Sequence, residues 1–163
     1  MTQPLISIIV VNYNGINHLD ACLKSIKQTD YMNSETIVVD NGSSDGSADY
    51  IERNFKNIKL IRNKSNLGAA GGYNTGIMNA RGKYVAILNN DIEVPPNWLT
   101  PLVNVMEADE SIAAVDPKYL NFYDRERFDT IAAAGRYLDH FGNVYARGAG
   151  GLDDGQYDRP VRI

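Results

Sequence analysis

The stretch YVAILNND, residues Tyr84 to Asp91, has five strand-forming or apolar residues followed by three polar ones. Gly82 precedes the stretch, and Pro95 and Pro96 follow it. An uninterrupted apolar run of this length, bounded by turn residues, is typical of a strand that is covered on both faces in a parallel sheet. The stretch therefore predicts an α/β fold with this strand inside the sheet.

The polar end of the same stretch has a predictable position. In parallel sheets the ligand crevice lies beyond the carboxyl ends of the strands, where Asn89, Asn90 and Asp91 would emerge. A carboxylate beside carboxamides suits a hard cation such as Mg²⁺, which takes one or two protein carboxylates together with diphosphate oxygens. A simple turn is the other interpretation, because Asn and Asp favour turns. These residues alone leave both interpretations open.

Further strands and helices alternate along the chain. The runs 5–11, 36–40 and 58–62 predict buried strands, and 112–115 predicts another. Apolar residues at helical spacing predict the helices between them. Their expected buried faces are Leu19, Cys22, Leu23 and Ile26 after an Asn17 cap; Ala48, Ile51 and Phe55; and Leu99, Leu102, Val103 and Met106 after Pro96. Four strand–helix alternations predict a parallel, doubly wound sheet.

Each predicted strand ends in polar residues. These are Asn12, Tyr13 and Asn14; Asp40 and Asn41; Arg62 and Asn63; and Asn89, Asn90 and Asp91. Parallel strands emerge at one edge of the sheet, so four separate clusters become one candidate site.

The segment 63–80 is rich in glycine but trends helical towards Ala80. Glycine costs about 1 kcal/mol in a helix relative to alanine, so the glycines from Gly68 to Gly76 need a compensating reason. Close approach of the backbone to a ligand is one reason, and close packing of helix on sheet is the other. The sequence does not decide between them.

The regular alternation is lost after Val115. Residues 139–142 predict the turn of a hairpin, with His140 as an exposed turn residue rather than a catalytic base. Residues 148–160 have the composition of a loop. Residues 161–163 predict a strand that is cut off as it begins, and its unpaired edge would favour a homodimer.

Composition excludes several classes of function. The 163 residues carry a net charge of -4 without a dense Lys/Arg cluster, so no nucleic-acid partner is expected. The longest apolar run, 5–11, is too short for a membrane span, and the first residues do not predict a signal peptide. Cys22 is the single cysteine and there are two histidines, so any metal here should be oxygen-bound. A cytoplasmic protein is expected.

Two motifs are rejected on their context. Residues 42–46 match the G-x-S-x-G nucleophile elbow, but His140 is the only histidine downstream, and serine and aspartate at a helix start are explained by capping. Residues 68–76 do not match G-x-G-x-x-G, and there is no P-loop.

Four segments, taken together, resemble the family 2 glycosyltransferases, and among them the rhamnosyltransferase-like members most. They are IIVVNYN at 8–14, VVDNGSSDG at 38–46, NLGAAGGYNTG at 66–76 and LNND at 88–91. The resemblance implies the Rossmann-like GT-A fold, a mostly parallel sheet with helices on both faces. It also implies one domain over 1–163, truncated at its C-terminus, with a nucleotide-sugar-binding half at 1–115 and the start of an acceptor-side half at 116–163.

The resemblance also implies roles for individual residues. Tyr13 would lie against the nucleotide base and Asp40 would bond it, while Asp91 would bind the metal as the last residue of a D-x-D-like motif. This chain departs from that motif in having Asn89 where the motif begins with aspartate. The implied nucleotide-sugar-binding residues are Asn12, Tyr13, Asn14, Asp40, Asn66, Gly68, Gly72, Asn74, Asn89 and Asn90, with Asp91 as the ligand of Mg²⁺ or Mn²⁺.

The implied reaction is inverting transfer of a sugar, of the hexosyl or rhamnosyl type. The donor would be a UDP-, dTDP- or GDP-sugar, and the acceptor a hydroxyl of a glycan or lipid-linked molecule, in polysaccharide or cell-surface glycan synthesis at the inner face of the membrane. No segment matches the family's catalytic aspartate, and Asp153, Asp154 and Asp158 are poor substitutes. A nucleotide-sugar-binding module without turnover is the alternative. A sugar-phosphate nucleotidyltransferase is disfavoured, since no phosphate loop follows the first strand.

Overall fold

The structure is a computed structural model that describes residues 3–161. The chain divides into two compact units, Met1–Thr100 and Pro101–Ile163. The boundary lies within a helix, α4 (Leu99–Ala108). The division into functional halves at residue 115 stays a prediction.

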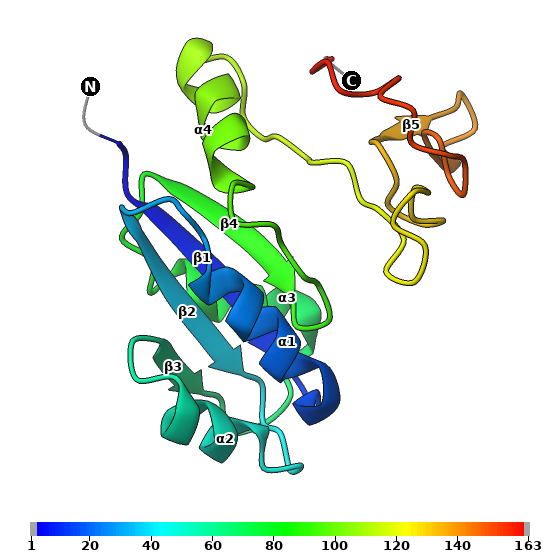
Figure 1. Cartoon of the computed structure of the whole chain (residues 1–163). Helices are drawn as coiled ribbons and strands as arrows, with labels where there is room; N and C mark the ends of the chain where they lie inside the picture. Colours follow the sequence, from blue (N-terminus) through cyan, green and yellow to red (C-terminus); the bar gives the residue numbers. More distant parts are fainter. Residues whose placement is uncertain (1–2, 162–163) are drawn as a thin grey trace. The chain divides into compact units, whose positions relative to one another are not determined.

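The first unit is built on a four-stranded parallel sheet (Figure 1). Its strands are β1 (Ile6–Asn12), β2 (Ser34–Asp40), β3 (Lys59–Arg62) and β4 (Tyr84–Asn89), in the spatial order β3-β2-β1-β4. All three pairings are parallel. These four predicted strands are therefore confirmed, and each begins or ends within two residues of its expected bounds.

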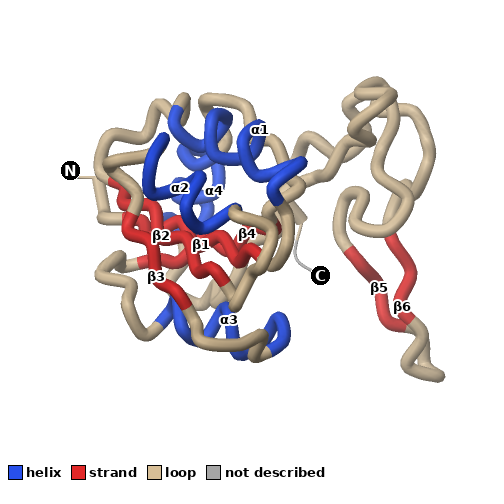
Figure 2. Tube along the Cα trace, turned by 90° about the horizontal axis from the view of Figure 1, so that it is seen from below, coloured by secondary structure: helices blue, strands red, loops and turns tan. Residues whose placement is uncertain are grey.

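Helices cover both faces of this sheet. Figure 2 shows α1 (Ile16–Lys27) and α2 (Ser47–Asn54) on one face and α3 (Gly68–Ile77) on the other. The predicted stripe of α1 is buried in full, from Leu19 to Ile26. Because β1 and β2 are covered on both sides, six of the seven residues of β1 and the last four of β2 are buried. This burial explains the continuous apolar runs at 8–11 and 37–39.

Two glycines of α3 let the helix lie close against β1. A β carbon on Gly72 would lie 2.7 Å from Cγ1 of Val11, and one on Gly76 would lie 2.4 Å from Cγ2 of Ile9. Gly68 differs, because its φ is +73° and an added β carbon would meet no atom within 4 Å. Close packing therefore accounts for Gly72 and Gly76, while Gly68 lets the chain turn into the helix.

The expectation that β4 is covered on both faces is wrong. β4 is an edge strand, and Val85 and Ile87 are 38% and 50% exposed. The physical reason is the position of α3. Its glycines let the helix pack directly on β1, so the helix does not cover β4. An apolar run can thus form an edge strand.

The second unit has a small core of its own. Phe128 is fully buried, with Ala133 and Ala134 around it, and its ring centroid lies 5.3 Å from that of Tyr157. The expected hairpin is confirmed as β5 (Arg136–Leu138) and β6 (Val144–Ala146), and His140 is exposed in its turn. The sequence did not predict this core, since residues 119–134 have no clear period.

Two expected strands are not seen in the described residues. Residues 112–115 form no strand, since Ile112 closes a turn with Asp109 and the segment pairs with no other strand. Val161 belongs to no strand, and residues 162 and 163 lie outside the described part, so the homodimer through that edge stays a prediction. Within residues 3–161, no helix has the length and apolar character needed to cross a membrane.

Candidate functional site

The carboxyl ends of three strands meet at one edge of the sheet. Asn12 of β1 is in register with Asp40 of β2, and Nδ2 of Asn12 donates to Oδ1 of Asp40 at 3.2 Å. Nδ2 of Asn90, directly after β4, donates to Oδ1 of Asn12 at 2.8 Å. These strand ends therefore lie together, as expected, and their role as a binding site stays a prediction.

Asn12 lies at the centre of this network and is fully buried. Besides Asp40, its Nδ2 contacts Oγ of Ser43 at 3.2 Å and Oγ of Ser47 at 2.8 Å. Gly15 leaves room for Asn90, because a β carbon there would lie 1.9 Å from Nδ2 of Asn90. Asn12 therefore holds neighbouring strand ends together from beneath the site.

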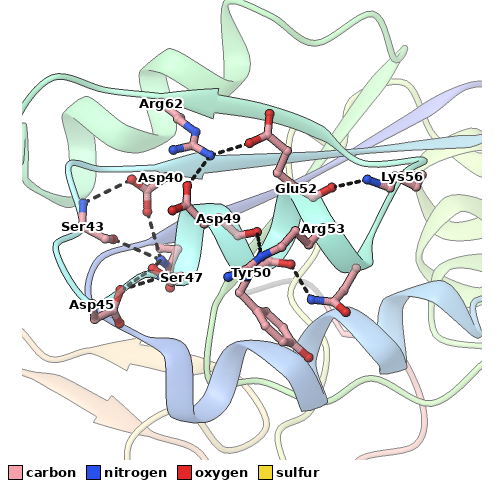
Figure 3. Close-up of polar contacts among 12 residues, drawn as sticks. Asp40, Ser43, Asp45, Ser47, Asp49, Tyr50, Glu52, Arg53, Lys56 and Arg62 are labelled. Carbon is pink, nitrogen blue, oxygen red and sulfur yellow. Dashed lines mark hydrogen bonds and ion pairs between the residues drawn. The ribbon is translucent and has the colours of Figure 1, made fainter.

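The loop after β2 is tied down by two carboxylates (Figure 3). Asp40, only 3% exposed, accepts from the backbone N–H of Ser43 at 3.2 Å. Asp45 accepts from the N–H and hydroxyl of Ser47 and from the N–H of Ile16. Burial alone would raise the pKa of Asp45, but these hydrogen bonds outweigh it and lower the pKa. The G-x-S-x-G match is thus explained by loop structure.

Asn41 fixes the opposite wall of the site. Its Nδ2 donates to Oδ1 of Asn66 at 2.9 Å and to the carbonyl of Gly68 at 3.0 Å. Its Oδ1 accepts from Nδ2 of Asn63 at 3.0 Å. The sequence placed Asn41 in the candidate site, as a polar residue that directly follows a buried strand. It was not among the nucleotide-sugar-binding residues that the resemblance implies.

A pocket of about 290 Å³ opens between these elements. Its lining is Val11, Tyr13, Asn41, Asn66, Gly68, Ala69, Tyr73, Asn89 and Asn90. No charged side chain lines it, and the ring of Tyr13 is half exposed at its rim. The pocket is therefore neutral, rich in carboxamides and suited to a polar ligand with an aromatic or flat face.

The other predicted residues lie around the pocket rather than in its lining. Asp40 and Asn12 are buried beneath it. Oδ1 of Asn14 accepts from the N–H of Ser44 at 2.8 Å, which shapes the loop, and Gly72 packs on β1. Asn74 is exposed on α3.

Tyr73 is a lining residue that the sequence did not single out. Its hydroxyl donates to Oδ1 of Asn89 at 2.6 Å. Burial, and then the negative charge of Asp91, raise the pKa of Tyr73, so the hydroxyl keeps its proton. The available signal was an aromatic residue within the glycine-rich segment.

The residues after β4 fit a divalent cation of modest affinity. Asp91 is exposed and makes no side-chain hydrogen bond or ion pair within residues 3–161, and Oδ1 of Asn90 accepts none there either. Such oxygens are the ligands that Mg²⁺ and Mn²⁺ prefer. The described residues contain no cluster of three His, Cys, Asp or Glu side chains that could hold a metal, so a cation would need further oxygens from its ligand or from water.

Two aspartates of the second unit form ion pairs with the same lysine. Nζ of Lys118 lies 2.5 Å from Asp153 and 2.6 Å from Asp158. The hydrogen bond from Lys118 lowers the pKa of Asp153, which makes this carboxylate a weaker base. Both carboxylates are therefore paired with Lys118, and the base of the reaction stays unassigned.

Comparison with known proteins identifies the family. The model of the family "Glycosyl transferase family 2" matches residues 7–147. The chain belongs to this family. An uncharacterized glycosyltransferase of Haemophilus influenzae is 36% identical over 115 residues, which cover 69% of this chain and 36% of that protein. Glycosyltransferase GlyG of Streptococcus pneumoniae is 28% identical over 130 residues, covering 78% of this chain and 42% of that protein.

Solved structures agree with this family. The mannosyltransferase PcManGT of Pyrobaculum calidifontis, in complex with GDP-Man and Mn²⁺, has 27% identity and a TM-score of 0.69, over 77% of this chain and 39% of that one. S. aureus TarS 1-349, in complex with UDP, shares the fold at 20% identity and a TM-score of 0.60, over 71% of this chain and 39% of that one. The expected GT-A-like fold is confirmed. The chain spans less than half the length of each of these relatives.

Proposed function

We propose that this chain is the donor-binding part of an inverting glycosyltransferase that moves a sugar from a nucleoside diphosphate sugar to an acceptor hydroxyl. The observation that carries the proposal is the neutral, carboxamide-lined pocket at the carboxyl ends of β1, β2 and β4, with the carboxylate of Asp91 beyond β4. In parallel α/β sheets this edge is where nucleotides bind.

The pocket suits one part of such a donor. At about 290 Å³ it lies at the lower end of the range of roughly 300–1,000 Å³ that is usual for small-molecule sites. It lacks the cations that a free diphosphate would need, and it offers carboxamides and the ring of Tyr13 instead. In this proposal the nucleoside occupies the pocket, Tyr13 packs against its base, and Asp40 supports the base from below.

The diphosphate is assigned to the cation side. We place Mg²⁺ or Mn²⁺ at Asp91, with Oδ1 of Asn90 as a further oxygen, and the complex of PcManGT with GDP-Man and Mn²⁺ supports this choice. When bound there, a divalent cation would neutralise the charge that develops on the departing diphosphate. The protein's own residues orient the donor and hold the loops around it.

The acceptor side of the proposal rests on the sequence resemblance. The acceptor is a glycan or lipid-linked hydroxyl at the inner face of the membrane, and the role is polysaccharide or cell-surface glycan synthesis. The base that removes the acceptor proton is assigned to the part of the family's length that this chain does not span. A rhamnosyl- or hexosyl-type donor is proposed on the same ground.

A thermal stability screen tests the proposal. The protein would be melted with UDP-, dTDP- and GDP-sugars, each with and without Mn²⁺. A ligand at 100 times its Kd stabilises a protein by about 2.7 kcal/mol, which gives a measurable rise in Tm. We expect one nucleotide class to stabilise the protein, and more strongly with Mn²⁺. The absence of a shift with all three classes would contradict the proposal.

A further inference from the structure

Asn89 and Asn90 face the pocket with opposite hydrogen-bonding groups. The hydroxyl of Tyr73 lies 2.6 Å from Oδ1 of Asn89. This length fits an O–H···O bond, commonly about 2.7–2.8 Å, better than an N–H···O bond of about 2.9–3.0 Å. The hydroxyl also lies 3.4 Å from the carbonyl of Leu88, a much longer contact, so its proton is assigned to the oxygen of Asn89. Its Nδ2 makes no hydrogen bond within residues 3–161 and remains available as a donor.

The carboxamide of Asn90 has the opposite orientation, with its nitrogen bonded within the protein. Its Nδ2 donates to Oδ1 of Asn12 at 2.8 Å. Asn12 cannot exchange its own oxygen and nitrogen, because its Nδ2 is surrounded by oxygens of Asp40, Ser43 and Ser47. The buried oxygen of Asn12 thus requires the nitrogen of Asn90. Oδ1 of Asn90 remains available as an acceptor.

A third carboxamide follows the same logic. Oδ1 of Asn66 accepts from Nδ2 of Asn41 at 2.9 Å and from the N–H of Gly68 at 2.8 Å. Its Nδ2 is then available to the pocket that it lines. The pocket therefore offers donors from Asn66 and Asn89 and an acceptor from Asn90.

We propose that Tyr73 and Asn12 are positioning residues that fix Asn89 as a hydrogen-bond donor and Asn90 as an acceptor towards the bound ligand. As a result, Asn90 and Asp91 supply oxygens for a divalent cation. Asn89 donates a hydrogen bond to an oxygen of a hydroxyl-bearing ring of the ligand, either in the nucleoside or in the sugar. The identity of the ring rests on the proposed function, whereas the orientation of the carboxamides rests only on their hydrogen bonds within the protein.

The orientation has a consequence for metal binding alone. An N–H group directed towards a cation repels it, so the Tyr73 hydrogen bond keeps Asn89 from acting as a metal ligand. Tyr73→Phe would free Asn89 to turn its oxygen towards the cation. Asn89→Asp would place an oxygen there in either orientation and would still accept from the Tyr73 hydroxyl.

The first measurement is a titration with Mn²⁺ alone, followed by water-proton relaxation. We expect Asn89→Asp to bind Mn²⁺ about tenfold more tightly than the parent protein, because hard cations favour additional carboxylate oxygens. Tyr73→Phe should also bind it more tightly, because the oxygen of Asn89 could then turn towards the cation. Asn57→Asp is the control, because Asn57 is exposed before β3, at the opposite end of the sheet.

The second measurement is calorimetry with UDP, dTDP and GDP in the presence of a chelator. The same two variants should bind the preferred nucleotide more weakly, by about tenfold for Asn89→Asp, which replaces a donor by an acceptor, and by at least about twofold for Tyr73→Phe. Tyr73→Phe tests the orientation of Asn89 without changing the charge of the protein. Opposite effects on metal and on nucleotide are the signature, because a variant that merely unfolds would weaken both.

Each outcome decides a separate question. Unchanged Mn²⁺ affinity in Tyr73→Phe, with a Tm equal to that of the parent, would overturn the proposed orientation. Weaker binding of both Mn²⁺ and nucleotide would assign Tyr73 a structural role only and would also overturn it. If the Mn²⁺ pattern holds while the parent binds none of UDP, dTDP and GDP, the proposed function fails and the orientation stands.

Discussion

At the scale of single residues, the side chains that shape the site differ from those that can touch a ligand. Asn12, Asp40 and Asn41 are buried, and their side chains are hydrogen-bonded to neighbouring strand ends and loops. Asn89 and Asp91 are exposed. Burial of polar groups is tolerated because their partners are present. Substitutions of the first group should therefore affect stability and binding together, and substitutions of the second group should affect binding alone.

Replacement of Asp91 tests the metal site. Asp91→Ala should abolish the additional rise in Tm that Mn²⁺ produces with a nucleoside diphosphate, because Asp91 is the carboxylate proposed as the metal ligand and hard cations prefer such oxygens. The Tm without ligand should change little, since surface substitutions usually alter stability by less than about 0.5 kcal/mol. Glu110→Ala, at an exposed turn of the second unit, is the matched control. An equal Mn²⁺-dependent shift in Asp91→Ala and the parent would refute the assignment.

Replacement of Asp40 should act independently of the metal. Asp40→Asn keeps the size of the side chain but removes the charge that accepts from Asn12 and Ser43. We expect weaker nucleotide binding at every Mn²⁺ concentration and a loss of unfolding free energy of about 1–3 kcal/mol, because a charged acceptor is lost in a buried network. Calorimetry with and without Mn²⁺, together with urea unfolding, measures both. A loss of affinity confined to the metal-containing samples would contradict this role.

At the scale of elements, the distance between α3 and β1 decides where the pocket wall lies. Gly76→Ala should destabilise the protein although alanine is the better helix former by about 1 kcal/mol, because the new carbon would lie 2.4 Å from Ile9 and overpacking typically costs about 1–3 kcal/mol. Ala70→Gly, at an exposed position of the same helix, is the control and should lose up to about 1 kcal/mol through helix propensity alone. Urea unfolding measures both. A stabilised Gly76→Ala would show that α3 can move away from the sheet.

The amino ends of the strands are joined by a second polar cluster. Glu35 of β2 accepts from the hydroxyl of Ser7 at 2.7 Å and from the backbone N–H of Arg81 at 2.8 Å, and it forms an ion pair with the Arg81 side chain. Burial alone would raise the pKa of Glu35, but the hydrogen bonds from Arg81 and Ser7 outweigh it and lower the pKa. The carboxylate therefore connects β1, β2 and the turn that precedes β4.

The contribution of Glu35 to stability should depend on pH. Because its pKa is lower in the folded than in the unfolded state, the stabilisation is present above the unfolded pKa and is lost as the pH falls through the folded pKa. At neutral pH, Glu35→Gln should be less stable than the parent by about 1 kcal/mol, a modest value since Arg81 is largely exposed. Urea unfolding of both proteins should show this difference shrinking below about pH 5. A constant difference down to about pH 3 would contradict the lowered pKa.

At the scale of the whole molecule, the described residues hold the proposed donor site, and none of their carboxylates is assigned as the base. Its relatives are more than twice as long. We therefore expect the 163-residue chain to bind donor and to transfer sugar slowly, because general-base assistance contributes typically 10² to 10⁴ in rate.

Transfer rates with a nucleotide-sugar test this expectation. The 163-residue chain would be compared with a form extended to the length of its relatives, using the donor identified by the stability screen. Donor affinity should be similar in the two forms, and the transfer rate should differ by at least about a hundredfold. Equal rates would place the base within the present chain and would direct attention back to its own carboxylates.

The sequence by itself determined the parallel sheet, its strand positions and the edge where the polar residues gather. Continuous apolar runs such as Ile8–Val11 have a local cause, since strands covered on both faces need apolar side chains throughout. The glycine-rich segment also indicated a close approach, although not whether the approach was to ligand or to sheet. The hairpin at β5 and β6 followed from its turn residues.

The tertiary structure alone decided which polar side chains are buried and which way the carboxamides point. Oδ1 of Asn12 meets Asn90, which is 78 residues away in the chain, and its Nδ2 meets Asp40, which is 28 residues away. The exposure of β4 likewise depends on the packing of α3 against β1. Burial and hydrogen-bond polarity are set by partners brought from distant segments, and for that reason no local pattern in the sequence could specify them.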